Sequence, residues 1–284
     1  MAHQIIAWLL LGLGLVFGAV LLRRGWRERE ALRQERGRMW LLCALEVPIY
    51  FLATLGISDF LLHTLLLRRG RLTADENLPG TLIAAGLTPG AVIAFALLQG
   101  ENPVDLPTLL LCCAGIAGGS VLGARFVRRL DGGKIRRIMA VALIASMAVL
   151  ILKLILSAGA SGAATGLSPW FLALAVVFSL FWGAVNMVGV PMKAAGTAFF
   201  LLLGMSPLST LTLVLVMGCL GPMSGSVEVI RGGRYHRKTV CAAVIFGSLG
   251  AVLGCLFTVA ISPLALNVLL LAVMLVAIVT MLRK

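Results

Sequence analysis

Long hydrophobic runs recur along this chain, separated by short polar connections. The first, IIAWLLLGLGLVFGAVLL, occupies residues 5–22 and is followed at once by two arginines. A helix of about 20 residues crosses the roughly 30 Å hydrocarbon core of a bilayer, so runs of this length are typical of membrane spans. The pattern predicts an all-α polytopic membrane protein, with spanning helices at 5–22, 79–98, 106–124, 138–157, 207–227, 239–260 and 264–282.

Two longer apolar segments are interrupted near their middles, at LGISD in 39–67 and at NMVGVP in 169–203. Each must begin and end on the same side of the membrane if the neighbouring helices are to reach their own connections. We therefore expect two helical hairpins that enter the bilayer from one side, with two short full spans as the alternative. Gly56 and Gly189 allow sharp turns, and Pro191 ends an incoming helix. Irregular backbone at that depth lines a cavity or is buried in protein, and a packed kink is the competing interpretation.

The chain also contains an internal similarity. GSVLGARF at 119–126 and GAVLGCLF at 250–257 share five residues in register, 131 positions apart. Inverted-topology repeats recur in secondary transporters, with the substrate site at the interface between the repeats. We expect an N-terminal transmembrane helix with a basic cytoplasmic loop (1–38), a first inverted repeat (39–157), a linker (158–168) and a second inverted repeat (169–284), each repeat being a hairpin followed by three helices.

Composition and charge narrow the class further. Hydrophobic residues make up 60% of the chain and charged residues 12%, which excludes a soluble globular domain. The net charge of +13 does not indicate nucleic acid, because three connections, 23–38, 125–137 and 231–238, hold 17 of the 24 lysines and arginines. By the positive-inside rule these connections are cytoplasmic. We expect a multi-pass protein of the plasma (inner) membrane, with its N-terminus outside and its C-terminus in the cytoplasm.

The sequence gives little indication of metal, redox or catalytic chemistry. The six cysteines all lie in apolar runs without metal-type spacing, and we interpret them as small packing residues. Within the apolar segments the acidic residues are Glu46 and Asp59, whereas a membrane enzyme needs clustered acids or a nucleophile with its base. We expect no cofactor, no metal site and no enzymatic activity.

The segment GENPVDLPTLLLCCAGIAGGSVLGARFVRRLDGGKIRRIMAVALI at 100–144 combines Val-Asp, a Gly-rich helix, an Arg-containing loop and another helix. It resembles the sulfite exporter TauE/SafE family of membrane anion permeases, and GGRYHRKTVCAAVIFGSLGAVLGCLF at 232–257 is the counterpart in the second half. With the hairpins, the resemblance covers most of 39–282. It implies export or uptake of sulfite, sulfonates or other small oxyanions and carboxylates. The hairpin breaks keep only part of the Gly-rich run that is typical of the family.

Lys193 is the central candidate for substrate binding. It follows the break in 169–203, and charged residues in the interior of a membrane protein usually mark a substrate or ion path. The alternative is a shallow position from which the side chain snorkels to the interface. Gly196 and Thr197 are expected to begin the outgoing arm of this hairpin, whose free N–H groups suit an anion.

The other expected substrate-binding residues lie at the two breaks or beside the internal prolines Pro89 and Pro222. They are Asn186, Gly189, Gly56, Ser58, Thr88 and Ser224, in addition to Lys193 and Thr197. Structural roles compete at several of these positions. Ser58 is a good helix cap, Asn186 is a good turn residue, and hydroxyls beside a proline can bond to freed helix carbonyls.

Three residues are candidates for proton coupling: Asp59, His63 and Glu46. His63 lies four residues after Asp59 on the same helical face, so the two could form a relay, and a structural histidine is the alternative. Glu46 is costly if it is buried without a partner, and a position at the cytoplasmic interface is its alternative. Asp59 and Lys193 are 134 positions apart, close to the repeat offset. We therefore expect the two hairpin tips to face each other and these charges to attract while the site is empty.

These observations predict a secondary transporter (permease) that moves small anions such as sulfite, sulfonates or related organic anions across the plasma membrane, with protons as a candidate coupling ion. An anion channel and a structural or accessory membrane subunit without transport activity are the alternatives. The expected partners are the small anion, protons and the lipid bilayer. Nucleic acid is not expected, and a homo-oligomer is left open.

Overall fold

The computed structural model describes residues 2–99, 104–127, 129–156, 162–257 and Leu275, and the predicted span 264–282 lies almost wholly outside them. Every secondary-structure element in the described residues is a helix, as predicted. In chain order the elements are α1 (Ala2–Arg27), α2 (Arg29–Gln34), α3 (Met39–Thr54), α4 (Asp59–Arg69), η1 (Asp75–Asn77), α5 (Leu78–Leu98), α6 (Leu106–Val127), α7 (Gly132–Leu156), α8 (Pro169–Asn186), α9 (Lys193–Leu202), α10 (Pro207–Gly232), α11 (Arg237–Ala242), η2 (Ala243–Gly247) and α12 (Ser248–Leu256).

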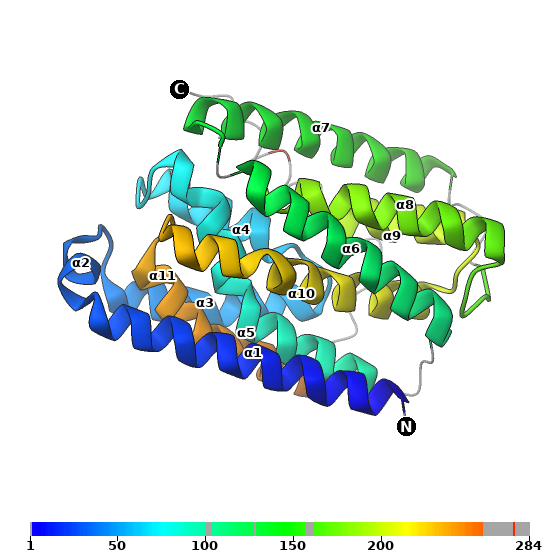
Figure 1. Cartoon of the computed structure of the whole chain (residues 1–284), viewed down its shortest axis with the longest axis horizontal. Coiled ribbons are helices and arrows are strands. Elements are labelled where there is room, and N and C mark those ends of the chain that lie inside the picture. Colours follow the sequence, from blue (N-terminus) through cyan, green and yellow to red (C-terminus); the bar gives the residue numbers. More distant parts are fainter. Residues whose placement is uncertain (1, 100–103, 128, 157–161, 258–274, 276–284) are drawn as a thin grey trace.

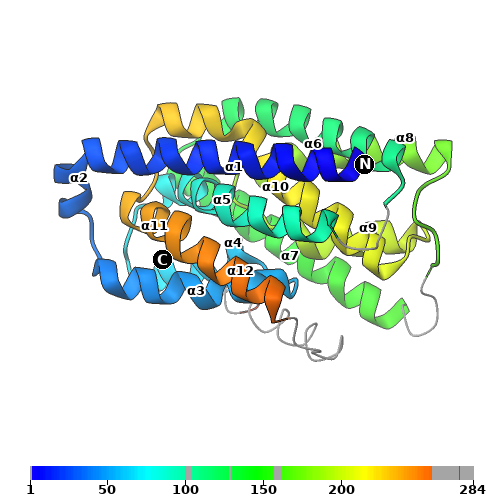
Figure 2. The same cartoon turned by 90° about the horizontal axis from the view of Figure 1, so that it is seen from below.

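Six of the described helices are long and apolar enough to cross a membrane. They are Ala2–Arg27, Asp75–Leu98, Leu106–Val127, Pro169–Asn186, Pro207–Gly232 and Arg237–Leu256. The last is continuous through a short π-helical segment, η2, between α11 and α12. The long helices lie side by side along the longest dimension of the molecule (Figures 1 and 2). This arrangement is that of a polytopic helical membrane protein.

The predicted basic connections gather at one end of the bundle, which we call the basic end (left in Figure 1). Arg237 at the start of α11 bonds to Glu28 and Glu35 in the connection after α1, and Gly132 packs on Glu76. The contact of Gly37 with Leu72 joins these two pairs, so all four connections lie at the same end of the bundle.

The opposite end, which we call the far end, carries the connections that lack lysine and arginine. The Asp105 N–H donates to the Thr165 carbonyl, and Ser206 and Ala164 share a backbone hydrogen bond. His3 near the N-terminus contacts the Val104 carbonyl at 2.8 Å. The N-terminus therefore lies at the far end (Figure 1).

Two helical hairpins enter the bundle from opposite ends. The α3–α4 hairpin begins and ends at the basic end, where Gly37 lies against Leu72, and the α8–α9 hairpin begins and ends at the far end (Figure 1). α9 has 10 residues, which is about 15 Å of helix and half of a bilayer core. Each interrupted segment is thus a pair of helices joined by a turn at the predicted break. The division of the chain into two inverted repeats stays a prediction.

α5 and α10, which contain Pro89 and Pro222, form the most buried part of the bundle. Around them, the Gly-rich helices pack closely on the longer hairpin arms. A Cβ at Gly119 or Gly123 of α6 would clash with the backbone of α8, and a Cβ at Gly250 of α12 would clash with the backbone of α3. Small residues on one helix face permit such close approach in membrane proteins. This packing holds both hairpins against α5 and α10.

Candidate functional site

Both hairpin turns contain a glycine with left-handed backbone geometry. The first hairpin turns at 55–58, where Gly56 has a φ of +92°, and the second turns at 187–192, where Gly189 has a φ of +97°. Residues that carry a side chain are strained at such angles. These two glycines therefore fix where the chain folds back, as the breaks in the sequence pattern predict.

The outgoing arm of the second hairpin begins at Lys193, with Met192 as its N-cap residue. The sequence pattern predicts Gly196 and Thr197 at this position, and that prediction is wrong. The incoming helix α8 already ends at Asn186, so the expectation that Pro191 ends it is wrong. Pro191 instead lies just before the next helix, where its fixed φ is favourable. Thr197 consequently lies one turn into α9, and Lys193 occupies the helix start.

Lys193 joins the two hairpin tips. Its Nζ lies 3.0 Å from Oδ1 of Asp59 and donates to the carbonyl oxygens of Ala53, at 3.4 Å, and Ile57, at 3.3 Å. An ammonium has three hydrogens to donate, so the first hairpin supplies one acceptor for each. The Lys193 and Asp59 side chains are only 15% and 14% exposed. The predicted attraction between these two residues is confirmed.

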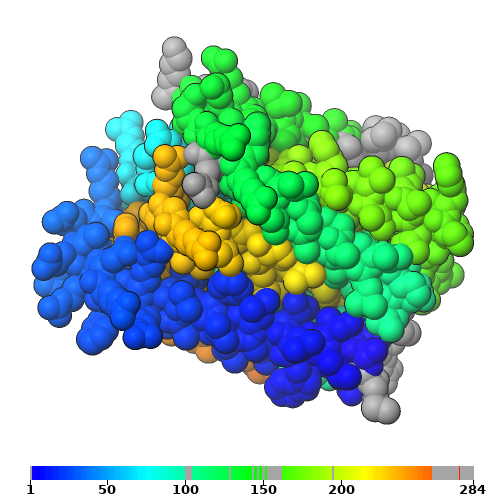
Figure 3. Space-filling view, in the orientation of Figure 1, coloured from blue at the N-terminus to red at the C-terminus, as the bar shows by residue number. Residues whose placement is uncertain are grey.

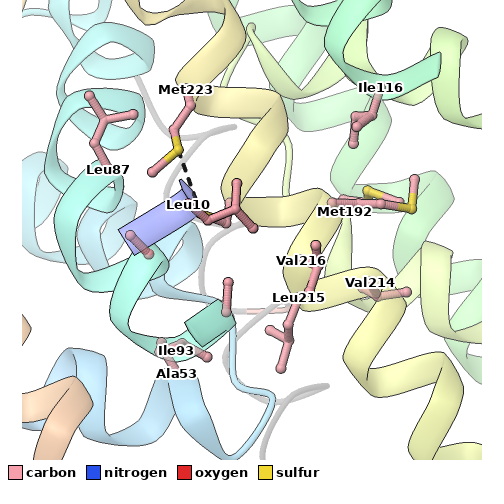
Figure 4. Close-up of a cluster of buried hydrophobic side chains, with 14 of the residues drawn as sticks. Leu10, Ala53, Leu87, Ile93, Ile116, Met192, Val214, Leu215, Val216 and Met223 are labelled. Atoms are coloured by element: carbon pink, nitrogen blue, oxygen red, sulfur yellow. Dashed lines mark hydrogen bonds between the residues drawn. The ribbon is translucent and has the colours of Figure 1, made fainter. Parts of the chain in front are cut away.

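A cavity opens beside this ion pair. It lies between the hairpin tips and the central helices α5 and α10. Polar side chains line the part next to the ion pair: Tyr50, Ser58, Asp59, Asn186 and Lys193. Elsewhere the wall is largely apolar and includes Ile93, Met192 and Leu215, which Figure 4 shows within the buried hydrophobic cluster. The cavity thus has one charged, polar region and one apolar region.

Two buried polar atoms on residues of the cavity wall have no hydrogen-bond partner among the described residues. They are the hydroxyl of Tyr50 and the side-chain oxygen of Asn186, on residues that are 1% and 3% exposed. An unpaired buried polar group costs about 1–3 kcal/mol. A ligand that bonds to these groups would remove this cost. The sequence pattern indicates Asn186 but misses Tyr50, which lies in an apolar run and carries no signal of its own.

The first turns of α4 and α9 also line the cavity, through Ser58, Asp59 and Phe60 on one side and Met192 and Lys193 on the other. The N-cap side chains of these two helices make no capping hydrogen bond. Free N–H groups and the helix dipole make such N-termini favourable for negative charge. An ammonium, two helix starts and the unpartnered Tyr50 hydroxyl, which can donate, together suit a small anion.

Residues 1–150 match the family model described as sulfite exporter TauE/SafE, which is more than half of the 284-residue chain. The chain belongs to this family. Comparison with curated proteins and with solved structures gave no match. The TauE/SafE match includes α1, which the resemblance seen in the sequence leaves out, and it ends within α7. Together with the six apolar helices it identifies a multi-pass membrane protein of a transporter family.

Behind the cavity of this TauE/SafE protein, Glu46 of α3 and His63 of α4 form a fully buried pair. Nε2 of His63 lies 3.1 Å and 3.0 Å from the two carboxyl oxygens of Glu46, and Nδ1 lies 2.9 Å from the backbone oxygen of Asp59. A carbonyl only accepts hydrogen bonds, so Nδ1 carries a hydrogen. The contact between Nε2 and Glu46 also needs one proton. That proton lies either on Nε2, which gives an imidazolium facing a carboxylate, or on Glu46, which gives a neutral ring facing a carboxylic acid. The pair is therefore a one-proton site next to Asp59.

The sequence pattern places Asp59 and His63 on one helical face, which the structure bears out, but their contact uses the backbone oxygen of Asp59 rather than its carboxylate. The carboxylate is directed to Lys193. Sequence reasoning missed the contact between Glu46 and His63, because 17 residues separate them and only the fold of the hairpin brings them together.

Five predicted substrate-binding residues do not line this cavity: Gly56, Gly189, Thr88, Thr197 and Ser224. The Thr88 hydroxyl donates to the Gly14 carbonyl of α1 at 3.1 Å, and the Ser224 hydroxyl donates to the Leu220 carbonyl at 2.8 Å. Both hydroxyls thus bond to helix carbonyls, but neither is the carbonyl that Pro89 or Pro222 leaves without its N–H partner. Their part in substrate binding stays a prediction.

A second cavity lies on the other side of the second hairpin's turn, near the basic end and between α5, α6 and α10. Met187 lines this cavity, whereas the preceding residue, Asn186, lines the first. Met187 is fully buried in a cluster that includes Leu82 and Ile83. The turn of the second hairpin therefore separates the two cavities.

Proposed function

We propose that this protein is a secondary transporter that carries small anions, such as sulfite, sulfonates or related organic anions, across the plasma membrane. The observation that supports this most strongly is the position of Lys193. Its ammonium lies where the two hairpin tips meet, beside a cavity that also contains two helix starts. Buried charges in membrane proteins usually serve a substrate or ion path.

In this proposal the anion takes the place of the Asp59 carboxylate at Lys193. The ion pair offsets the cost of burying either charge alone while the site is empty. The Tyr50 hydroxyl then donates to an oxygen of the anion, because it lies on the cavity wall without a partner. The unpartnered side-chain oxygen of Asn186 is an acceptor, so it bonds to the anion only where an oxygen of the anion carries a hydrogen. Protonation of Asp59 weakens its hold on the ammonium, so anion binding strengthens as the pH falls.

The Glu46–His63 pair is the proposed companion proton site. Its one proton is held within hydrogen-bond distance of the Asp59 backbone, on the same helix start that lines the cavity. A change of charge there acts on Asp59 across a low-dielectric interior. Coupling of anion movement to protons follows from these two sites together.

A carrier is favoured over an open channel because the turn of the second hairpin, which includes the fully buried Met187, separates the two cavities. Continuous conduction would need an unobstructed path. A carrier needs access to alternate between the two cavities, and the hairpin turn is the element that would have to move.

The test is uptake into liposomes that contain the purified protein, with sulfite, sulfate, a short alkanesulfonate and acetate as substrates, with and without a proton gradient. Lys193→Ala should abolish anion binding and uptake. Asp59→Asn should keep binding but lose its pH dependence. Lys193→Arg should transport poorly, because a planar fork replaces a compact charge.

The matched control is Lys134→Ala, which removes an exposed lysine at the basic end, 66% exposed and paired with Asp131. It should leave uptake unchanged. The proposal is refuted if none of the anions is transported, or if Lys193→Ala keeps the rate and affinity of the unmodified protein.

A further inference from the structure

A hollow at the basic end lies outside the proposed transport site. It has about 710 Å³ of space and is lined by the end of α1, by Glu28 and by Ile230 of α10. Figure 3 shows α1 along the outer edge of the molecule beside α10. The lining residues from α1 are Val20, Arg23, Arg24 and Arg27. The hollow therefore combines three arginines with one glutamate.

One arginine and the glutamate are already engaged. Arg24 pairs with Glu28 at 2.8 Å and donates to the Ile230 carbonyl, and Glu28 also pairs with Arg237 at 2.6 Å. The hydrogen bond from Arg24 lowers the pKa of Glu28, so this glutamate stays ionised. These contacts fix the wall between α1 and α10 and leave the charges of two arginines uncompensated.

Arg23 and Arg27 are exposed, and neither has a hydrogen-bond or ion-pair partner among the described residues. They are four residues apart, so the two guanidinium groups lie on one helix face, where like charges repel. Guanidinium groups bind phosphate through paired hydrogen bonds, and one phosphate between them would relieve this repulsion.

The same helix face continues as an apolar stripe. Leu9, Leu13, Val16 and Val20 are 67%, 40%, 59% and 45% exposed. Their alternating spacing of four and three residues continues to Arg23 and then Arg27, so all six side chains follow one face of α1. Trp26, which is 75% exposed, lies at the same end, and tryptophan is typical of membrane interfaces. An apolar stripe that ends in two arginines matches an acyl chain that ends in a phosphate.

We propose that this hollow binds the phosphate of an anionic phospholipid, whose acyl chain lies along the stripe on α1. The phosphate bridges Arg23 and Arg27, and the wall formed by Arg24 and Glu28 sets the position of α1 against α10. Basic clusters next to the ends of membrane helices commonly bind anionic headgroups. A free phosphate ion would use the arginines but not the stripe.

The experiment measures lipid binding to the purified, delipidated full-length protein by native mass spectrometry, with phosphatidylglycerol, phosphatidylcholine and inorganic phosphate as separate probes. Phosphatidylglycerol should bind more tightly than phosphatidylcholine. The double variant Arg23→Gln/Arg27→Gln should lower phosphatidylglycerol affinity about tenfold or more, because two charge-assisted contacts are lost.

The matched control is Arg29→Gln/Arg33→Gln on α2. It makes the same charge change with the same spacing, at exposed positions that do not line the hollow. It should keep phosphatidylglycerol affinity within about twofold. Equal losses in both double variants would show that net charge alone attracts the lipid and would overturn the proposal.

A third pair, Leu13→Ala/Val16→Ala, separates the two sources of phosphate. It should weaken phosphatidylglycerol binding while leaving the arginines in place. Inorganic phosphate that binds as tightly as the lipid, or a lipid affinity that the stripe variant does not change, would also overturn the proposal.

Discussion

Tyr50 carries a buried hydroxyl that makes no hydrogen bond within the described part of the chain. Its neighbours at the cavity are Gly86, Asp59 and Lys193. A Cβ added at Gly86 would lie 3.8 Å from this hydroxyl and 3.6 Å from Asp59 Oδ2, so the glycine keeps open the space in front of both groups. A buried hydroxyl that lacks a partner and faces open space is typical of a ligand contact. While no ligand is bound, such a hydroxyl destabilises the protein.

Tyr50→Phe should therefore have opposite effects on stability and binding. Loss of the unpaired hydroxyl should raise the free energy of unfolding of the anion-free protein by about 1 kcal/mol and lower anion affinity about fivefold to tenfold. Thermal unfolding in detergent and anion titration would measure the two quantities. Tyr235→Phe at the basic end, outside the cavity, is the control and should leave affinity unchanged. A Tyr50→Phe protein that is less stable yet binds equally well would contradict this role.

The start of α11 depends on one histidine. Nδ1 of His236 accepts from the Thr239 N–H at 3.3 Å, and Nε2 lies 3.1 Å from the Arg36 carbonyl. These two backbone partners require the neutral ring with its hydrogen on Nε2. Burial lowers the pKa of His236 below its usual value of 6.5, against the opposing effect of Glu35. Protonation would remove the acceptor that caps this helix.

The sign of the pH effect follows from the lowered pKa of His236. The folded state binds this proton less tightly than the unfolded chain, so its contribution to stability is complete above about pH 6.5 and falls as the pH drops below that value. Hydrogen exchange of the Thr239 amide, corrected for intrinsic rates, should show weaker protection at about pH 5.5 than at about pH 7.5. His236→Asn keeps a capping acceptor that does not titrate and should remove the difference. Equal pH dependence in both proteins would exclude His236 as the cause.

The turn of the second hairpin is the other element with a testable role, because Asn186 lines the first cavity and Met187, the next residue, lines the second. Gly218 lines the first cavity and has open space at its Cβ position, so Gly218→Cys is a suitable reporter in a protein whose six cysteines are replaced by alanine. An impermeant thiol reagent should reach it from the far-end side only.

Met187→Ala should make this reporter accessible from the basic-end side as well, because a short side chain no longer fills the gap. Met223→Ala removes another buried methionine, on α10, and serves as the control, which should keep one-sided access. Labelling from both sides in the unmodified hairpin would show that Met187 is not the barrier.

At the scale of the whole molecule, the distribution of charge predicts its orientation. Cysteines placed at Arg33 and Lys134, at the basic end, should be labelled only from the cytoplasm, and one placed at Thr165, at the far end, only from outside. This follows because lysine and arginine concentrate in the connections of one end. Labelling of Lys134 and Thr165 positions from the same side would contradict both the orientation and the hairpin topology.

Within the described residues, the sequence pattern predicts where each spanning helix lies, both hairpin turns and the contact of Asp59 with Lys193, because hydrophobic length, turn glycines and repeat spacing are all local or periodic signals. The contact of Glu46 with His63 and the position of Tyr50 depend on how α3 and α4 pack together, and no local signal records that. α9 starts at Lys193 and not at the expected Gly196, because Pro191 favours a helix start close behind it. The α1 stripe and the hollow at its end depend on exposure, which only the packed bundle defines.

The meeting of two hairpin tips between two cavities also has an electrical consequence. Space that admits water and ions conducts, so a membrane potential falls mainly across the part of the path that protein fills, here the turn next to Met187. A full elementary charge that crosses 100 mV changes in energy by about 2.3 kcal/mol. An anion that steps from the Lys193 side of the turn to the other would experience much of that difference over a short distance. The speed of this step, and not only its equilibrium, should therefore vary with voltage.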